Sequence, residues 1–493
     1  MCSRLLQAFP SVVHGVSTRF TRTLTGFTVK FVYETDNCVN GRAGRNPMVG
    51  RYRYSSIVNQ SRALSTPAKQ YEVLSHIEQV MTTFEDHKIH KFQSFLVSDD
   101  ALVQICDAYF QLELNERAAV LSWLCAKYGV QHNELLETCE ILQKCINKRK
   151  DATLLLAESR MRLQLEPLYN QIFKLIGRLD NGVKHLVDIR HDVETIAKSK
   201  AANIDVEQFQ NLSNHLKVIL SLWFSVGLLQ LKRITWETPA DILEKVGRNE
   251  LVHQIRSWLD LKHRLGPDRR CYAFFHSSMQ REPLVMLHVA LTDTISSDIT
   301  SIVDYSNKQV KSNEQPTTAI FYSISSTQNG LQGIDFGIHL IRKVVEEISK
   351  EFSTVNQFSS LSPIPQFRSW FMTQLKLTAK SKSEHELLLP SEVKELSAIL
   401  NVSNDSVYNS VWTILQDKAW KIDDNLHKLL KVILVRACAH YLHNVKHRGF
   451  AFDPVANFHF RNGAMLWRIN YNADPSIKGY EASFGLMVNY RYF

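Results

Sequence analysis

The chain has 493 residues, of which 44% are hydrophobic and 22% charged, and its formal net charge is +9 at pH 7. This composition is typical of a globular protein, which excludes a fibrous or wholly disordered chain, and the length predicts about two to four domains. The positive charge could indicate a nucleic-acid partner, but residues 1–70 hold ten basic and only two acidic residues. Eight of the nine excess charges lie there, so we expect no nucleic-acid binding by the rest.

The N-terminal leader has the composition of a targeting segment. Residues 1–33 contain no Asp or Glu and are rich in Ser, Thr, Phe, Leu and Arg, as in a mitochondrial transit peptide. The alternative is a disordered basic tail. We expect residues 1–70 to be a transit peptide and basic leader that sends the chain to the mitochondrial matrix. The chain ends at Phe493 without a peroxisomal tripeptide, and cytoplasmic or peroxisomal forms stay open.

Membrane and metal signals are weak. No apolar run reaches the ~18 residues that span a bilayer, so we expect no membrane contact. The eight cysteines contain no C-x-x-C pair, and we therefore predict neither a zinc site nor a disulfide framework.

Residues 71–222 show a helical pattern. Gly and Pro are scarce, and apolar residues recur at spacings of three and four; Ala118, Leu121, Leu124 and Cys125, for example, share one face. Each amphipathic segment buries one stripe, so the pattern predicts an α-helical bundle domain whose default role is packing or assembly.

Residues 223–493 mix strands with helices, which predicts an α/β or α+β domain. Apolar runs at 271–275, 284–291 and 319–324 are strand candidates, and a helix follows from Phe336. Near the C-terminus, Asn462-Gly463 separates residues 458–460 from 464–469, which predicts a hairpin turn. Residues 489–493 are predicted to form an edge strand.

Three segments could carry chemistry. The first is the turn before the helix, where Gly330, Gly333 and Gly337 would let backbone approach a phosphate at a helix start. A tight strand-to-helix turn explains the same glycines equally well. The turn is neither a Walker loop nor a dinucleotide fingerprint, because it lacks both spacings.

The second and third segments centre on Ser362 and His459. Pro363 holds Ser362 extended, although the pattern alone favours Ser362 as the N-cap of a helix that begins at Pro363. His459 lies between aromatic residues on the predicted hairpin, where a partly buried structural histidine is the more common case.

These three segments, in this order and spacing, resemble the malonyl-CoA decarboxylase family. The resemblance covers all but residues 1–70 and is weaker in the helical half. It is most specific in the segments Arg269-Arg270-Cys271-Tyr272, Gly330-Leu331-Gln332-Gly333, Ser362-Pro363-Ile364-Pro365, His447-Arg448-Gly449 and Leu466-Trp467-Arg468-Ile469-Asn470.

The resemblance implies the fold and the site. Its members join a helical domain to a catalytic domain of the GNAT acetyltransferase superfamily, which implies an α+β chain with a helical domain at 71–222 and a GNAT-like α/β domain at 223–493. The implied CoA-binding loop, with the pyrophosphate at the helix start, comprises Gln332, Gly333, Ile334, Asp335, Phe336, Gly337 and Ile338. The superfamily pattern Q/R-x-x-G-x-G/A is kept except that its middle glycine is displaced to Gly333. The charge of Asp335 must then point away from the phosphates.

The family reaction converts malonyl-CoA to acetyl-CoA and CO2 and so sets the malonyl-CoA level in fatty-acid metabolism. The family's catalytic serine and histidine fall on Ser362, the proton acceptor and partner of the carboxylate, and on His459, the proton donor; both also contact substrate. We expect His459 to act as a general acid with a pKa near neutrality. We expect no metal, biotin or pyridoxal phosphate, because the thioester is its own electron sink. The resemblance also implies a homotetramer.

Two other classes of function stay open. The same CoA loop would serve an acyl-CoA-dependent N-acetyltransferase, which would consume acetyl-CoA with an amine acceptor. A helical scaffold with an inactive CoA-like domain would turn over neither thioester.

Overall fold

The computed structural model describes residues 23–24, 27–28, 67–86, 97–148, 151–199, 204–304, 315–334, 336–381, 387–416, 420 and 422–493. The chain divides into two compact units, residues 1–61 and 62–493. In the first, β1 (Thr23–Leu24) and β2 (Phe27–Thr28) form an antiparallel pair. The second unit holds the other described elements, and none of the described helices is long and apolar enough to cross a membrane.

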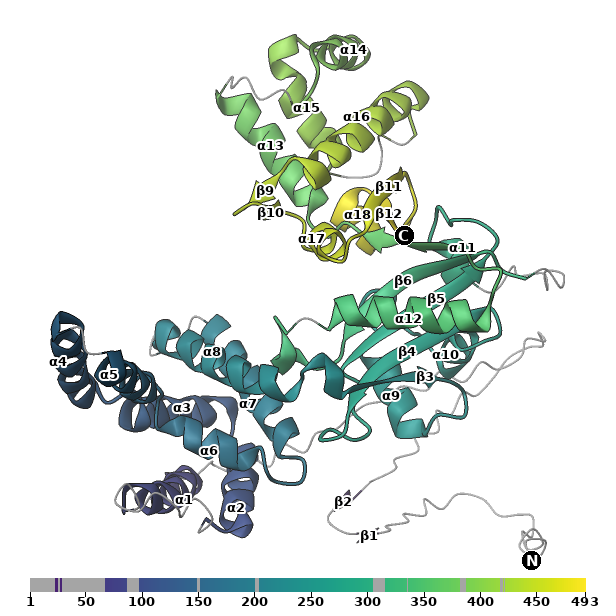
Figure 1. Ribbon diagram of the computed structural model, residues 1–493. Helices are drawn as coiled ribbons and strands as arrows, with labels where there is room; N and C mark the ends of the chain where they lie inside the picture. Colours follow the sequence, from purple (N-terminus) through teal and green to yellow (C-terminus); the bar gives the residue numbers. More distant parts are fainter. Residues whose placement is uncertain are drawn as a thin grey trace, which may run out of the picture. The chain divides into compact units, whose positions relative to one another are not determined.

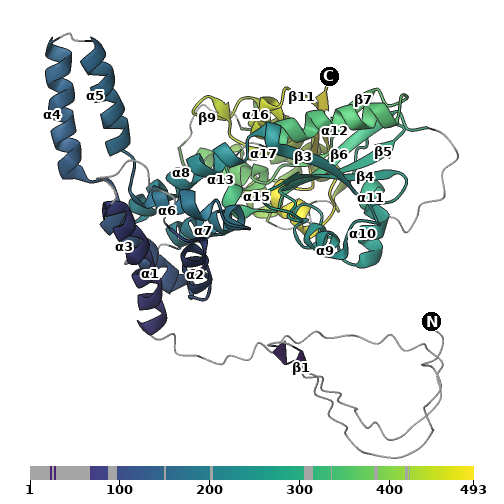
Figure 2. The same cartoon turned by 60° about the horizontal axis from the view of Figure 1, so that its bottom comes forward.

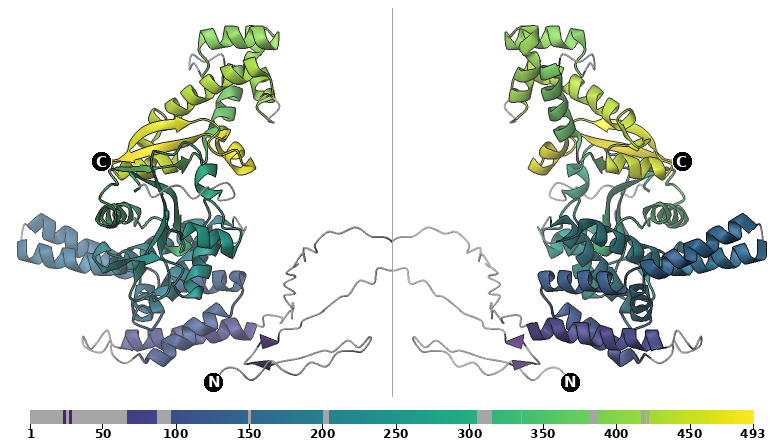
Figure 3. Two further views of the ribbon diagram at one scale, coloured as in Figure 1. Left: turned by 90° about the vertical axis from the view of Figure 1, so that its right-hand side faces the viewer. Right: turned by 90° about the vertical axis from the view of Figure 1, so that its left-hand side faces the viewer.

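The second unit begins with a helical bundle, as predicted. Side-chain caps start two of its helices: Ser98 Oγ accepts from the Ala101 N–H, and the Asp205 carboxylate accepts from the Gln208 N–H. The described helices are α1 (Pro67–Asp86), α2 (Asp99–Phe110), α3 (Leu114–Tyr128), α4 (His132–Lys148), α5 (Asp151–Gln164), α6 (Tyr169–Ile176), α7 (Gly182–Lys198) and α8 (Val206–Trp223). Figure 2 shows that α4 and α5 form a helical hairpin that projects from the other helices, and Figure 3 shows the same projection from two further sides.

A mixed eight-stranded sheet follows, with the order β11-β12-β7-β6-β5-β4-β3 and β8 paired to β12. Only the β6–β7 pair among these is parallel, and α12 connects those two strands (Figure 1). The predicted strand runs are confirmed, because each coincides to within one residue with part of a strand that is buried on both faces. The strands are β3 (Leu229–Ile234), β4 (Arg269–His276), β5 (Val285–Thr292), β6 (Thr318–Ser326), β7 (Gln357–Ser360), β8 (Ser362–Pro363), β11 (Met465–Asn470) and β12 (Met487–Tyr492).

Helices cover both faces of the sheet. The predicted helix is α12 (Gly337–Glu351), and its Leu340, Val344 and Ile348 pack on one face in the same apolar core as α7 and α8. The helical half and the sheet therefore share one continuous core. The opposite face packs on α9 (Ala240–Arg248) and α10 (Trp258–Arg264).

A second helical cluster lies between β8 and the last strands in the sequence, with its own core around Phe367, Leu434 and Tyr441. The remaining described elements are η2 (Val226–Leu228), α11 (Thr300–Val303), η3 (Asn329–Leu331), α13 (Phe367–Ser381), α14 (Pro390–Leu400), η4 (Asn404–Ser406), α15 (Val407–Ile414), α16 (Asp424–His443), β9 (Lys446–His447), β10 (Phe450–Ala451), α17 (Pro454–Arg461) and α18 (Ile477–Ser483).

Three local predictions were wrong. Residues 458–460 belong to α17, not to a hairpin strand, because Asp453-Pro454 starts a helix and Gly463, with φ of +76°, follows its end. β12 is an interior strand between β11 and β7, not an edge strand. Ser362 does not cap a helix at Pro363, because it lies in β8 and the next helix begins at Phe367.

Candidate active site

The helix α17 presents His459. Asp453 Oδ1 accepts hydrogen bonds from the N–H groups of Val455 (3.0 Å) and Ala456 (2.9 Å), and Pro454 fixes the first helical φ. One turn later His459 points at β12, where its ring stacks on Tyr490 with centroids 4.3 Å apart and planes 16° from parallel. The helix cap and the stacked ring thus hold the imidazole at a fixed place.

The short strand β8 presents Ser362. The residue before a proline prefers extended backbone, and Ser362 pairs with Val488 of β12 in that conformation. The structure brings Ser362 and His459 together: Ser362 Oγ lies 2.8 Å from His459 Nε2, and both residues are buried. The two residues are 97 positions apart in the sequence, and β12 contacts both of them.

His459 is bonded at both ring nitrogens. Nδ1 lies 2.6 Å from the Tyr492 hydroxyl, and Ser362 Oγ donates to Ser360 Oγ at 2.8 Å. A neutral imidazole has one N–H and one lone pair. Because the Ser362 hydroxyl proton is directed to Ser360, Nε2–H donates to Ser362 and the Tyr492 hydroxyl donates to Nδ1. The ring therefore carries its proton at Nε2, on the serine side.

Burial lowers the pKa of His459 to about 3, because desolvation disfavours the imidazolium. The expected pKa near neutrality is therefore wrong for the unliganded protein, in which the ring is neutral at pH 7. Burial also raises the pKa of Tyr492, so its hydroxyl stays protonated.

Sequence reasoning missed Tyr492, Tyr490 and Ser360. The two tyrosines alternate with polar residues on β12, so they share the face that contacts α17. The alternation could have indicated a shared buried face if β12 had been predicted as an interior strand. Ser360 accepts from Ser362 and from the Tyr490 N–H at 3.2 Å, which ties the serine to the sheet.

The glycines of the predicted CoA loop have separate structural causes. A Cβ at position 330 would lie 1.8 Å from the carbonyl oxygen of Val187 in α7, and a Cβ at 337 would lie 2.2 Å from the Phe458 ring. Gly333 has φ of +79°, which glycine adopts at little cost. Because Phe458 precedes His459, the start of α12 lies beside the helix that carries the histidine.

The other loop residues divide by burial. Gln332 and Gly333 are exposed, Ile334 is half-buried, and Phe336 is buried against Phe224, with ring centroids 6.0 Å apart. Asp335 lies outside the described residues, as does the side chain of Ile338. The described part of the loop therefore offers an open glycine turn above an anchored phenylalanine.

The pairing of β6 with β7 ends partway along β6. β6 and β7 pair from Thr318↔Gln357 to Phe321↔Ser360, after which β6 runs on to Ser326 while the chain from β7 turns into β8. The Leu361 N–H donates to the Phe321 carbonyl as the last rung, at 3.0 Å. Backbone pairing of β6 with this part of the chain therefore ends at Leu361, next to Ser362.

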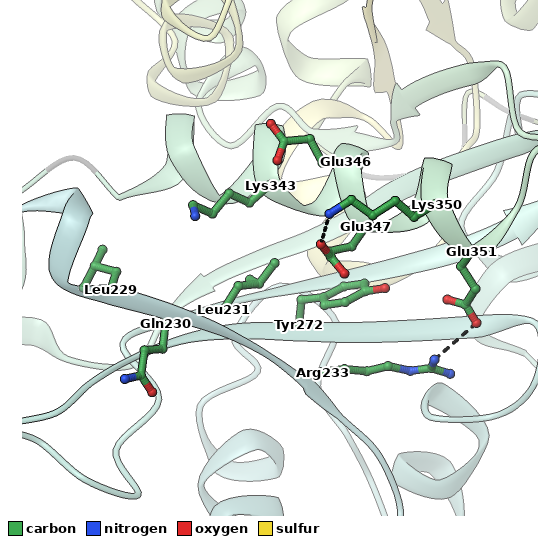
Figure 4. Close-up of a pocket in the computed structure, with 10 residues that line it drawn as sticks. All are labelled: Leu229, Gln230, Leu231, Arg233, Tyr272, Lys343, Glu346, Glu347, Lys350 and Glu351. Carbon is green, nitrogen blue, oxygen red and sulfur yellow. Dashed lines mark hydrogen bonds and ion pairs between the residues drawn. The ribbon is translucent and has the colours of Figure 1, made fainter.

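A separate cavity of about 770 Å³ lies between β3 and α12 (Figure 4). It is lined by three basic and three acidic side chains, and two opposite pairs are in contact: Arg233–Glu351 at 3.2 Å and Lys350–Glu347 at 2.7 Å. It contains none of the predicted site residues. With balanced charge, it is a poor place for a polyanion such as CoA.

The fold and the site define an α+β protein in which a helical region precedes a mixed α/β region with a buried Ser–His pair. The family model of the malonyl-CoA decarboxylase C-terminal domain matches residues 227–493, and that of the malonyl-CoA decarboxylase N-terminal domain matches residues 128–224. The chain belongs to the malonyl-CoA decarboxylase family, which confirms the family, the fold class and the enzyme class predicted from the sequence.

Similar proteins agree. The chain is 44% identical over 381 residues to the mitochondrial malonyl-CoA decarboxylase of Anser anser anser, covering 77% of this chain and 75% of that one. It is 43% identical over 383 residues to the Rattus norvegicus protein of the same name, covering 77% of each. The crystal structure of malonyl-CoA decarboxylase from Rhodopseudomonas palustris superposes with a TM-score of 0.70 at 32% identity, over 86% of this chain and 93% of that one. The crystal structure of malonyl-CoA decarboxylase from Agrobacterium vitis superposes with a TM-score of 0.71 at 29% identity, over 85% of this chain and 92% of that one.

Proposed function

We propose that this chain decarboxylates malonyl-CoA to acetyl-CoA and CO2 at the Ser362–His459 pair. The observation that carries the assignment is the buried 2.8 Å contact between Ser362 Oγ and His459 Nε2, close to the point where the pairing of β6 with β7 ends. Family membership supports the substrate and favours this reaction over the N-acetyltransferase and the inactive scaffold.

The CoA part would bind at residues 332–338 and the start of α12. The first N–H groups of a helix have no partner within the helix and meet its positive dipole end, which suits a pyrophosphate. The exposed Gln332 and Gly333 leave the turn open to a ligand. The acyl arm would run past the point where the pairing of β6 with β7 ends and reach Ser362.

The carbon–carbon bond breaks when the malonyl carboxylate leaves as CO2 and its electron pair passes into the thioester, giving an enolate. Ser362 would hydrogen-bond the leaving carboxylate and hold its bond aligned with the thioester π system. The buried setting keeps the carboxylate poorly solvated, which favours movement of charge toward the thioester oxygen. A proton delivered to C2 then completes acetyl-CoA.

His459 would supply that proton. The free ring is neutral, but an anionic carboxylate and then an enolate beside it favour the imidazolium, so the pKa of His459 rises in the complex. The ring takes up a proton as substrate binds and passes it from Nε2 to C2. The Tyr492 hydroxyl suits both states, because it can donate to Nδ1 or accept from Nδ1–H.

One assay separates the three functions. The purified full chain is given malonyl-CoA without ATP or added metal, and acetyl-CoA and CO2 are measured. We expect equal amounts of both products. An N-acetyltransferase would release no CO2 and would consume acetyl-CoA when an amine is added, and a scaffold would do neither; either result would overturn the proposal.

We also propose a homo-oligomer, a tetramer by resemblance to the family, assembled through the α4–α5 hairpin. The hairpin carries apolar side chains that are each more than half exposed, namely Leu136, Ile146, Leu155, Leu156 and Leu163. A projecting hairpin with such side chains suits burial against another copy. Light scattering should show an oligomer that Leu155→Asp/Leu163→Asp dissociates and that the polar control Gln143→Asp leaves intact.

The leader and the domain limits complete the proposal. The relatives named above are mitochondrial, which supports residues 1–70 as a matrix address, followed by a helical domain at 71–222 and a catalytic domain at 223–493. Most of residues 1–70 lie outside the described residues. A fluorescent protein fused behind residues 1–70 should enter mitochondria, and a fusion in which the ten basic residues are replaced by Gln should stay outside.

A further inference from the structure

The helical half forms one wall of the predicted CoA loop. The 3-10 turn η3 packs against α7, with no room for a side chain between Gly330 and the Val187 carbonyl. From the same helix, the buried Arg190 guanidinium donates to the Gly330 carbonyl oxygen and to the Ser213 carbonyl oxygen, and it pairs with Glu194 at 2.7 Å. The position of the loop therefore depends on helices for which the sequence predicted only packing or assembly.

The neighbouring helix α8 brings a cation to the loop. A Cβ at position 333 would lie 2.9 Å from Lys217 Nζ and 3.4 Å from Lys217 Cε. The end of the lysine side chain therefore lies directly beside the exposed turn, and Gly333 itself is needed for the φ of +79°.

The surroundings leave Lys217 available for an anion. Lys217 is half-buried, the end of its side chain lies beside the turn, and within the described part of the chain no carboxylate forms an ion pair with it. Arg190, by contrast, is committed to Glu194 and to backbone oxygens. Among these two cations, Lys217 is the one free to meet a ligand.

We propose that Lys217 binds the pyrophosphate of the CoA substrate, so that the helical half supplies part of the substrate site. This inference rests on the proposed placement of CoA at residues 332–338. The ammonium lies beside the turn that leads into α12, where the pyrophosphate would meet the helix start. A lysine is a compact donor that suits a phosphate oxygen and adds to the attraction of the helix end.

The test compares three thioesters that keep different parts of the nucleotide: malonyl-CoA, 3′-dephospho-malonyl-CoA, which lacks only the 3′-phosphate, and malonyl-pantetheine, which lacks the pyrophosphate together with the adenosine. For Lys217→Ala we expect KM to rise about ten-fold with the first two, which keep the pyrophosphate, while kcat changes less than two-fold. With malonyl-pantetheine, KM should equal that of the unaltered chain. Lys217→Arg should restore most of the affinity, because it keeps the charge.

Two controls make the result specific. Lys350→Ala removes an exposed lysine from the last turn of α12, away from the loop, and should leave every KM unchanged. Lys217→Met keeps the aliphatic stem if Lys217→Ala loses stability. If Lys217→Ala raised KM for malonyl-pantetheine by the same factor as for malonyl-CoA, the proposed phosphate contact would be wrong. If Lys217→Ala raised KM for malonyl-CoA but not for 3′-dephospho-malonyl-CoA, Lys217 would contact the 3′-phosphate, and the proposed pyrophosphate contact would be wrong. Lack of turnover by the unaltered chain would overturn the proposed function itself.

Discussion

The Tyr492 hydroxyl lies 2.6 Å from Nδ1 of His459, on the far side of the ring from Ser362. Three residues from different parts of the sequence thus form one hydrogen-bonded chain across a buried imidazole. Because the tyrosine can donate to the ring or accept from it, it stabilises the ring in either protonation state and fixes its orientation.

Replacing Tyr492 by Phe should therefore slow the chemical step. Phe keeps the ring that packs edge-on to Phe321 but removes the hydroxyl, so His459 can rotate and loses its partner when charged. We expect kcat to fall on the order of 10-fold or more, with KM changed little, measured by acetyl-CoA formation. An unchanged kcat would exclude Tyr492 from the mechanism.

His459 should make the folded state sensitive to acid. Its pKa is about 3 in the folded protein against about 6.5 when unfolded, so between these values the unfolded chain binds a proton that the folded chain does not. Stability from this group is fully present above pH 6.5 and is lost as the pH falls toward 3, by on the order of 5 kcal/mol. The difference in urea midpoint between the unaltered chain and His459→Asn should change across this range, and a constant difference would contradict the burial effect.

Asp453 should have the opposite effect. Burial raises its pKa to about 6, so the folded chain keeps a proton that the unfolded chain releases from about pH 4 upward. Stability from this group is lost as the pH rises through 6, by roughly 3 kcal/mol. Asp453→Asn keeps the helix cap and should gain stability relative to the unaltered chain between pH 4 and 6. Asp205→Asn, at the exposed cap of α8, is the matched control, and equal behaviour of both variants would contradict the prediction.

Gly330→Ala should disturb the junction between η3 and α7. The new Cβ would meet the Val187 carbonyl oxygen, which belongs to the backbone and cannot rotate away. We expect a loss of about 1–3 kcal/mol in the free energy of unfolding and a higher KM for malonyl-CoA. Gly247→Ala in α9, where a Cβ meets nothing within 4 Å, should instead be neutral or slightly stabilising in urea titrations. Similar losses in both variants would contradict the account of this junction.

Periodicity predicted the elements whose signals are local and strong. Leu340, Val344 and Ile348 recur every four residues, and all three are fully buried in α12. The strand runs were recognisable because strands buried on both faces are almost wholly apolar. The predicted hairpin failed because Asn462-Gly463 also suits the end of a helix, and the helix-start signal at Asp453-Pro454 was the stronger one.

The site could not be predicted from periodicity. Ser362 and His459 entered through the family resemblance, since patterning alone favoured a structural role for both. Tyr492 and Lys217 were missed for a different reason. The alternation on β12 indicated that Tyr490 and Tyr492 share a face, but it did not indicate what that face contacts. Tyr492 meets His459 from another element, and Lys217 lies on a helix more than a hundred residues before the loop, so a single sequence does not identify either contact.

The central claim is that Ser362 and His459 carry out the decarboxylation together, and single-turnover kinetics of the purified full chain test it most directly. Ser362→Ala and His459→Asn should each lower the rate of acetyl-CoA formation from malonyl-CoA by at least ~100-fold, with circular dichroism and urea unfolding showing a folded protein. Wild-type rates in either folded variant would contradict the claim. In the case of His459→Asn they would direct attention to His447 of the exposed β9–β10 hairpin.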